Sequence, residues 1–176
     1  MSGHNKWTQI KRQKEKTDGQ KSKTYSKYAR LLYIESRKSG GNMTFPSLVA
    51  TIERAKKDNV PKDVIERAIR KGSDPSAENL ESITYEAYGP GGVAIVIEAL
   101  TENKNKAAQE IKHILSEAGF SLASIGSATW AFSKSGIDWI PTSTIELSEK
   151  DMEDLQGLVE ALENNDEVQN IYTNAE

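Results

Sequence analysis

The spacing of apolar residues changes near Ser73, and this change constrains the fold more than any other feature of the chain. Before Ser73, apolar residues recur every three or four positions, as on one face of a helix; after it, alternating and continuous apolar runs indicate strands between helices. The change coincides with 73–79, a stretch rich in Ser, Asp and Pro that is typical of a linker. We therefore predict an α+β protein with two domains, at 1–78 and 79–176.

The first domain is predicted to be a three-helix bundle that follows a flexible, basic arm. Helical spacing covers three segments: 17–38, a segment that begins between 44 and 47, and 61–72. The residues expected to end these helices are the pair Gly40-Gly41, Asn59 and Gly72. At Gly72 we expect the left-handed C-terminal cap itself. The arm covers 1–16, with Trp7 and Ile10 as its apolar anchors.

The second domain has the element order of a ferredoxin-like α/β sandwich with an extra strand. Strand patterns occur in five segments: 83–88, 93–100, 128–132, 137–147 and 168–173. Two amphipathic helices are predicted between them, at 104–118 and after Ser148, which forms a capping box with Asp151. From residue 93 onward the order is therefore strand, helix, strand, strand, helix, strand. The motif Gly89-Pro90-Gly91-Gly92 joins two strands and precedes no helix, so we predict a hairpin turn rather than a phosphate-binding loop.

The two parts of the chain carry opposite charge. Residues 1–72 hold 18 Lys and Arg against 7 Asp and Glu, a net charge of +11, whereas residues 73–176 hold 5 against 19, a net charge of −14. The overall charge of −3 hides this division. Because electrostatic potential is local, a basic module attracts phosphate even in a chain that is acidic overall. The first domain is therefore the predicted nucleic-acid-binding part.

A stripe of cations on the first predicted helix is the strongest candidate for phosphate contact. Lys23, Lys27, Arg30 and Arg37 lie at i, i+4, i+7 and i+14, which places them on one helix face. Such a stripe gains affinity when counterions leave the nucleic acid. The alternative is an ordinary solvated helix face. The concentration of positive charge in one module favours phosphate binding over that alternative.

Further candidates for nucleic-acid binding come from the arm, from the first helix and from the start of the 104–118 helix. They are His4, Lys6, Trp7, Lys11, Arg12, Lys14, Lys21, Asn103, Lys104, Asn105 and Lys106. Trp7 either stacks on an unpaired base or anchors the arm to the bundle. Asn103 and its neighbours either accept a phosphate at the helix N-terminus or simply cap it. For Tyr25 and Tyr28 we favour core packing over base stacking.

Composition excludes several other classes of protein. The chain has no cysteine, which rules out disulfides, thiolate metal sites and a cysteine nucleophile and fits a reducing compartment, so we expect a cytoplasmic protein. It lacks the apolar core of a signal peptide and any apolar run near the roughly 20 residues of a membrane span. His4 and His113 belong to no metal motif. We expect no metal, no cofactor, no membrane partner and no enzyme activity, and no signal specifies an oligomeric state.

Several motifs resemble those of the YebC/PmpR family from one end of the chain to the other. Four stretches carry the resemblance: Gly3-His4-Asn5-Lys6-Trp7 with Ile10-Lys11, Val60-Pro61-Lys62-Asp63 followed by Ile65-Glu66-Arg67-Ala68-Ile69, Tyr88-Gly89-Pro90-Gly91-Gly92-Val93, and Leu100-Thr101-Glu102-Asn103-Lys104-Asn105-Lys106. The segment 166–172 also matches the family's ending. Asn5 departs from the serine that the family usually has. The family's third domain, inserted between two strands, is missing, and 135–139 bridges the gap.

The resemblance implies two activities attached to the family: DNA-binding transcriptional regulation, and ribosome-associated assistance to translation, especially through proline-rich stretches. We expect a translation factor or translational activator that binds ribosomal RNA within the ribosome. Two reasons favour RNA: the first helix and arm show no helix-turn-helix reading surface, and flexible basic arms suit irregular RNA. The alternatives are a transcriptional regulator that binds double-stranded DNA, and a protein–protein adaptor that uses the acidic domain.

Overall fold

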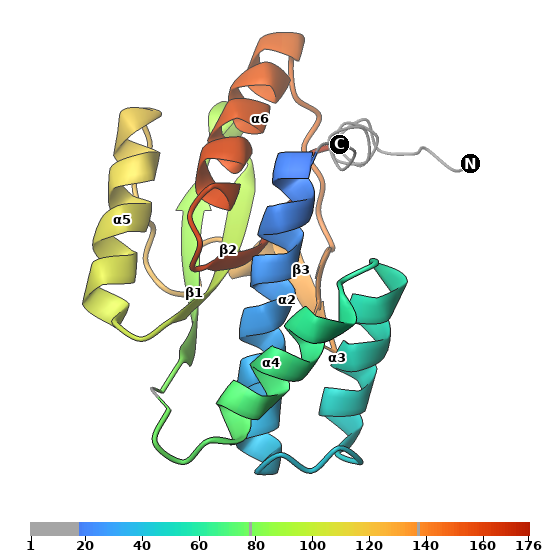
Figure 1. Cartoon of the computed structure of the whole chain (residues 1–176). Helices are drawn as coiled ribbons and strands as arrows, with labels where there is room; N and C mark the ends of the chain where they lie inside the picture. The colour runs from blue at the N-terminus through green and yellow to red at the C-terminus, as the bar shows by residue number, and fades with distance from the viewer. Residues whose placement is uncertain (1–17, 78, 137) are drawn as a thin grey trace. The chain divides into compact units, whose positions relative to one another are not determined.

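The structure, a computed structural model, describes residues 18–77, 79–136 and 138–176, with side chains from residue 21 onward (Figure 1). Within these residues the chain divides after Leu80 into a helical unit and an α/β unit. The domain bounds expected from the sequence stay predictions, because 1–17 and 78 lie outside the described residues. The predicted basic arm lies outside them as well.

The helical unit contains the three predicted helices: α2 (Asp18–Ser39), α3 (Pro46–Lys57) and α4 (Lys62–Ser73). Each has one apolar face, and these faces meet in a small core. The core consists of Leu32, Leu48, Ala55, Val60, Ile65 and Ala68, all buried. The predicted end of α3 is confirmed: Asn59 has φ of 58°, and the Val60 N–H donates to the Ala55 carbonyl at 2.9 Å, which closes the last turn.

Gly72 does not form the predicted left-handed cap. Helix α4 continues to Ser73, and Gly72 is buried within it. The φ angle of Gly72 is not in the positive region that a left-handed cap requires. A Cβ atom at Gly72 would lie 2.3 Å from the Tyr33 carbonyl oxygen and 2.9 Å from the Ser36 Cβ. The glycine is therefore explained by the close approach of α4 to α2, a tertiary contact that helical spacing alone does not reveal.

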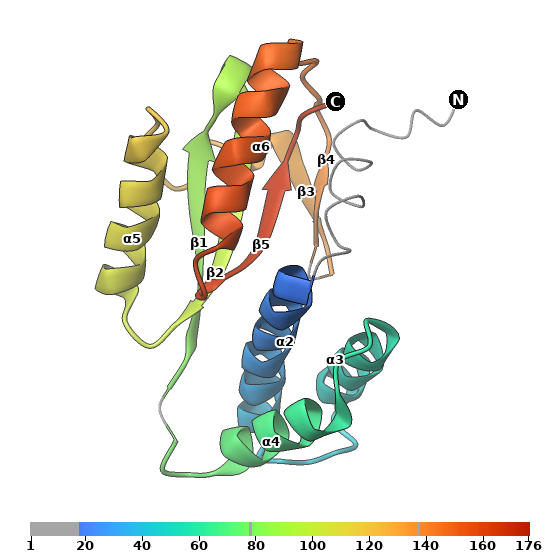
Figure 2. The same cartoon turned by 45° about the horizontal axis from the view of Figure 1, so that its top comes forward.

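The α/β unit is built on an antiparallel sheet of order β1-β2-β5, with β1 (Glu81–Tyr88), β2 (Ala94–Thr101) and β5 (Val168–Thr173). Helices α5 (Lys104–Glu117) and α6 (Glu149–Glu163) cover one face (Figure 2). A smaller sheet of β3 (Phe132–Ser135) and β4 (Asp138–Pro141) covers the other. Strand β2 is thus central and buried on both faces, as its continuous apolar run predicts.

The α+β class is confirmed, but the sheet differs from a ferredoxin-like sheet. That arrangement would place the strand predicted at 137–147 beside β2; in the structure β1 occupies this place, paired with β2 from Glu81↔Thr101 to Tyr88↔Ala94. The tight turn 89–92 brings these two strands together locally, which costs less chain entropy than a distant pairing.

The strands around β3 and β4 are also shorter than predicted. The segment predicted as a strand at 128–132 contains the 3₁₀ turn η2 (Thr129–Ala131). Among the described residues 138–147, only 138–141 form a strand. Strand β4 ends at Pro141, which has no backbone N–H to donate.

Candidate nucleic-acid interface

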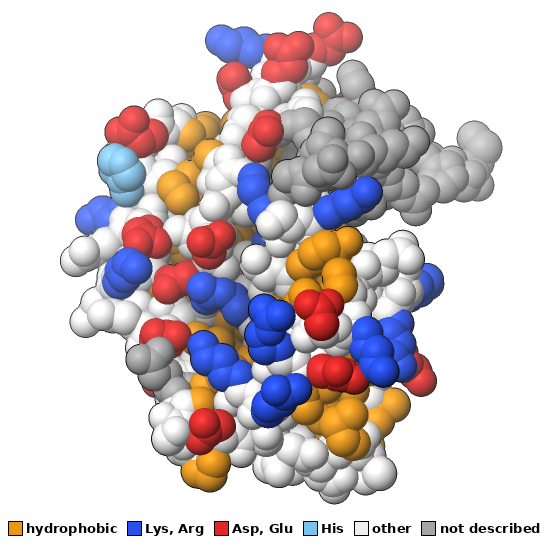
Figure 3. Space-filling model, in the orientation of Figure 1, with side chains coloured by type: hydrophobic (Ala, Val, Ile, Leu, Met, Phe, Trp, Pro, Cys, Tyr) orange, Lys and Arg blue, Asp and Glu red, His pale blue; other side chains and the backbone are white. Residues whose placement is uncertain are grey.

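The described helical unit is strongly basic. Over residues 21–77 it carries 13 Lys and Arg against 6 Asp and Glu. The cations come from all three helices: Lys21, Lys23, Lys27, Arg30, Arg37 and Lys38 on α2, Arg54, Lys56 and Lys57 on α3, and Lys62, Arg67, Arg70 and Lys71 on α4. In Figure 3 blue side chains gather over the front of this unit, where α4 lies. Clustered cations of this kind produce a positive local potential.

The predicted stripe lies on one continuous helix. Helix α2 includes Lys23, Lys27, Arg30 and Arg37 without a break, so their spacing does place them on one face. Lys23 is exposed and the other three are partly buried. The Arg37 Nη1 donates to the Asp74 carbonyl oxygen at 3.4 Å, which attaches the end of the stripe to the residue after α4. The role of the stripe in binding stays a prediction, as does that of Lys21, which is exposed on the same helix.

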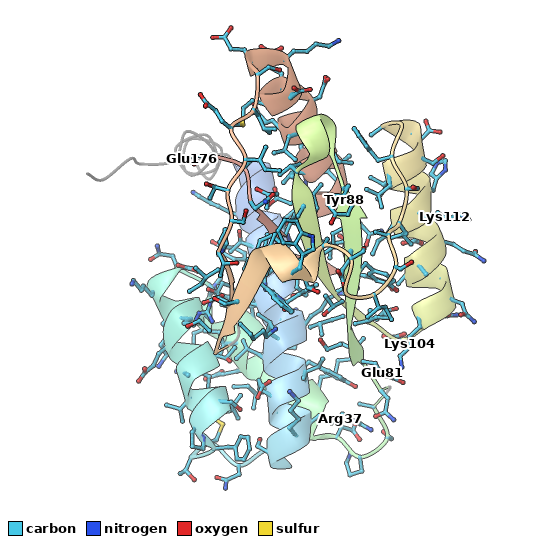
Figure 4. All side chains as sticks on the ribbon, turned by 180° about the vertical axis from the view of Figure 1, so that it is seen from behind. Arg37, Glu81, Tyr88, Lys104, Lys112 and Glu176 are labelled. Carbon is cyan, nitrogen blue, oxygen red and sulfur yellow. The ribbon has the colours of Figure 1, made fainter. Side chains whose placement is uncertain are left out.

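Asn103 caps helix α5. Its side-chain oxygen accepts hydrogen bonds from the backbone N–H groups of Asn105 and Lys106, both at 3.1 Å. Two of the free N–H groups at this helix end are therefore already used. Lys104 forms an ion pair with Glu81, and both lie at the same end of β1 in Figure 4; the Lys106 Nζ lies 3.6 Å from Glu110. The capping alternative accounts for Asn103, while phosphate binding at these four residues remains a prediction.

Tyr25 and Tyr28 both pack against the helical core, which confirms the preference for packing over base stacking. The Tyr28 hydroxyl donates a hydrogen bond to the Asp58 carboxylate just after α3. Burial, together with this bond and the negative charge of Asp58, raises the pKa of Tyr28 to about 12. The tyrosine thus connects α2 to the residue that follows α3.

The remaining predicted residues lie outside the described part of the chain: His4, Lys6, Trp7, Lys11, Arg12 and Lys14. The structure also exposes basic residues that were not among the binding residues predicted from the sequence. Arg70 and Lys71 are exposed in the last turn of α4, and Lys38 is exposed in the last turn of α2. Their signal was weak because cations in a last helical turn are expected from the helix dipole alone.

The described residues contain no cluster of three or more His, Cys, Asp or Glu that could hold a metal ion. Among the helices of 18–77, 79–136 and 138–176, none combines the length and apolar character needed to cross a membrane.

The fold and the distribution of charge together define a two-unit protein, in which a basic three-helix unit is followed by an acidic α/β unit. Sequence comparison is consistent with this division. The profile of the TACO1/YebC protein N-terminal domain matches residues 5–75, and that of the TACO1/YebC second and third domain matches 80–137 and 132–175. The chain belongs to the TACO1/YebC family.

Relatives and a solved structure support the assignment. A protein from Fervidobacterium nodosum named "Probable transcriptional regulatory protein" is 49% identical over 147 residues, covering 82% of this chain and 58% of that protein. A Thermotoga maritima protein with the same name is 44% identical over 161 residues, covering 90% of this chain and 61% of its own. The crystal structure of the conserved hypothetical protein Aq1575 from Aquifex aeolicus has a TM-score of 0.80 and 27% identity, covering 90% of this chain and 91% of that one.

The chain spans about three fifths of the length of the first curated relatives that it matches. A Thermoanaerobacter pseudethanolicus relative, 34% identical, aligns with all of this chain and 97% of its own over 239 positions, more than the 176 residues present here. That relative therefore contains segments that this chain lacks. The second profile match breaks at 132–137, within the β3–β4 hairpin, which is where the sequence motifs place the missing insertion.

Proposed function

We propose that this chain is a nucleic-acid-binding regulatory factor whose helical unit binds RNA, with ribosomal RNA in the ribosome as its ligand. The observation that carries the proposal is the excess of cations on the described helical unit, in a chain whose remainder is acidic. Lysines and arginines on adjacent helices can neutralise several phosphates at once, and the release of counterions then contributes much of the affinity. The acidic remainder would limit non-specific contact with nucleic acid.

The charges on α4 favour RNA over a sequence-reading contact with DNA. Helices α3 and α4 follow each other across a short turn, and in a helix-turn-helix protein the first turns of the second helix enter the major groove. Here those turns carry Asp63 and Glu66, both exposed. They form ion pairs along the helix, Arg67–Asp63 and Lys62–Glu66, each at 3.5 Å. Carboxylates at this position would lie near DNA phosphates and oppose insertion.

Binding to ribosomes and to a structured RNA hairpin tests the proposal. We expect the full chain to sediment with ribosomes at low salt, and the double variant Lys23→Glu, Lys27→Glu to bind the hairpin at least 10-fold more weakly. The slope of log affinity against log salt should also fall by about 0.7–0.9 for each phosphate that the variant no longer neutralises. The matched control, Lys112→Glu with Lys150→Glu, reverses two exposed lysines of the α/β unit and should leave affinity unchanged. Equal affinity of wild type and Lys23/Lys27 variant would overturn the proposal.

A second candidate, a DNA-binding transcriptional regulator, is favoured by the names of the relatives. It requires sequence preference: specific sites are bound typically 10³-fold or more tightly than random duplex, on the order of 4 kcal/mol. Selection from a random duplex pool would therefore enrich one motif. If the pool shows no enrichment, and structured RNA competes for binding better than any duplex, the RNA function is supported over this one.

A further inference from the structure

The turn between α2 and α3 displays two apolar side chains. Met43 is 54% exposed and Phe45 is 38% exposed, and neither belongs to the apolar core of the helical unit. Phe45 also occupies the N-cap position of α3, where it makes no side-chain hydrogen bond. Ser, Thr, Asp or Asn at that position would stabilise the helix. Neither core packing nor helix capping therefore explains why these two residues are apolar.

Local hydrogen bonds order the same turn. Gly40 and Gly41 have φ of 60° and 81°, a region that favours glycine. The Asn42 side-chain oxygen accepts hydrogen bonds from the Thr44 backbone N–H at 3.0 Å and from the Thr44 hydroxyl at 2.7 Å. The Phe45 N–H donates to the Asn42 carbonyl at 3.1 Å. Apolar side chains presented by an ordered turn lose little entropy when they bind a ligand.

Four cations lie in the last turns of α2 and α4, which meet where the α2–α3 turn begins. Gly41 lies against the end of α4, because a Cβ atom there would come 2.9 Å from the Ser73 Cβ. The Ser36 hydroxyl donates to the Ile69 carbonyl at 2.7 Å, so the last turns of α2 and α4 are adjacent. Those turns carry the four cations, and Figure 4 shows one of them, Arg37, at this end of α2. We call this set the end patch: Arg37, Lys38, Met43, Phe45, Arg70 and Lys71.

The carboxylates next to the end patch are already engaged. Glu35 accepts hydrogen bonds from the Lys38 ammonium at 3.0 Å and from the Ser47 hydroxyl. Asp74 accepts from the Ser76 N–H at 2.9 Å and from its hydroxyl at 2.7 Å. Four cations against these two carboxylates leave a net positive charge at the end of the helical unit where the turn with the two exposed apolar side chains begins. Cations beside stacking side chains are typical of sites for single-stranded nucleic acid.

We infer that the end patch binds unpaired nucleotides, with Phe45 and Met43 on base faces and the four cations on the flanking phosphates. The inference rests on the proposed function and adds a ligand class to it. In a duplex the base faces are stacked on one another and unexposed, so Phe45 and Met43 contribute only where bases are unpaired. The end patch thus selects loops, bulges or single strands. The stripe that begins with Lys23 and Lys27, in contrast, binds the phosphates of single strands and duplexes alike.

Fluorescence anisotropy with the full chain tests the end patch against three probes: a 12-nucleotide oligo(U), oligo(dT) of the same length, and a 12-base-pair RNA duplex. The double variant Met43→Ser, Phe45→Ser should bind both single strands about 10-fold more weakly, the size expected when one base no longer stacks on the protein, and the duplex within twofold of wild type. The single variant Phe45→Trp keeps an aromatic side chain and should bind both single strands as tightly as wild type. Its tryptophan fluorescence should also be quenched on binding. Ile125→Ser is the control, because Ile125 is 96% exposed in the other unit, and it should change nothing.

The two proposals fail in different ways. If wild type binds none of the three probes and does not sediment with ribosomes, the proposed function is wrong; if it sediments with ribosomes but binds none of the probes, the further inference alone is overturned. If wild type binds and the Met43/Phe45 variant keeps full single-strand affinity, or loses affinity equally for single strands and duplex, the end patch does not contact bases and the further inference alone is overturned. An equal loss of affinity of the Met43/Phe45 variant for oligo(U) and oligo(dT) would show that the end patch contacts the unpaired base rather than the ribose.

Discussion

The Glu86 carboxylate on β1 accepts a hydrogen bond of 2.7 Å from the backbone N–H of Ala128, 42 residues further along the chain. It also accepts from the N–H groups of Gly126 at 2.6 Å and Thr129 at 2.9 Å. Glu86 is only 5% exposed. Burial raises the pKa of this carboxyl, but the hydrogen bonds to three backbone N–H groups and to the Thr129 side chain outweigh it and lower the pKa overall. One buried charge therefore holds the segment before β3 against the main sheet.

Replacing Glu86 with Gln should destabilise the α/β unit. The amide can offer one accepting oxygen, and its NH₂ group faces backbone N–H groups that it cannot satisfy. A buried donor left without a partner costs about 1–3 kcal/mol. Urea unfolding of the full chain measures this loss. The control Glu153→Gln, on the exposed face of α6, should change stability by less than about 0.5 kcal/mol; equal stability of the two variants would contradict the role of Glu86.

Acid should destabilise the wild type more than the Glu86→Gln variant. The pKa of Glu86 in the folded state lies below its ordinary value of 4.5, so its contribution is present above pH 4.5 and is lost as pH falls through the lower folded-state pKa. Urea midpoints measured from pH 6 downward should therefore converge for the two proteins below pH 4.5. Parallel curves over that range would show that Glu86 keeps an ordinary pKa.

Alkali should act on the helical unit through Tyr28. Its pKa is raised to about 12 from 10.0, so its contribution to stability is complete below pH 10 and is lost as pH rises toward 12. The Tyr28→Phe variant lacks both the ionisation and the hydrogen bond to Asp58. Thermal unfolding between pH 8 and pH 12 should show a steeper fall for wild type than for this variant. An identical fall would mean that Tyr28 titrates normally.

Two glycine-to-alanine substitutions within helices should have opposite effects. At Gly72 the new Cβ would overlap the Tyr33 carbonyl oxygen, 2.3 Å away, and separating α4 from α2 should cost about 1–3 kcal/mol. At Gly157 in α6 nothing lies within 4 Å of the new Cβ, and alanine should stabilise the helix by about 0.5–1 kcal/mol. Urea unfolding measures both. Stabilisation at Gly72 would contradict the close packing of the two helices.

Asn103 offers a test that separates capping from phosphate binding. Asn103→Ala should destabilise α5 by about 0.5–2 kcal/mol, and Asn103→Ser, which retains a capping oxygen, should restore most of that stability. If capping is its role, RNA affinity should be the same for both variants and for wild type. Reduced RNA affinity of the stable Asn103→Ser variant would instead show that the asparagine contacts phosphate directly.

Local chemistry accounts for the features that sequence patterns predicted correctly. The helices α2, α3, α4, α5 and α6 follow from apolar spacing, because burying one face requires a period near 3.6. Asn59, Asn103 and Ser148 act within a few residues of their own position, so their roles are readable without a fold; the Ser148 hydroxyl accepts from the Asp151 N–H at 3.1 Å. The charge division between the two units is likewise a property of sequence.

Contacts between distant segments decided the rest. The sequence by itself determined the helices, the central strand β2, the family and the basic character of the first unit. Only tertiary structure decided that Gly72 serves packing against Tyr33, that Glu86 is buried beside Ala128, and that the turn after α2 meets the end of α4 at Gly41 and Ser73. The physical reason is that the spacing of apolar residues along a segment specifies which face of a helix or strand each residue occupies. The residue that it contacts on that face is determined by packing across the whole unit.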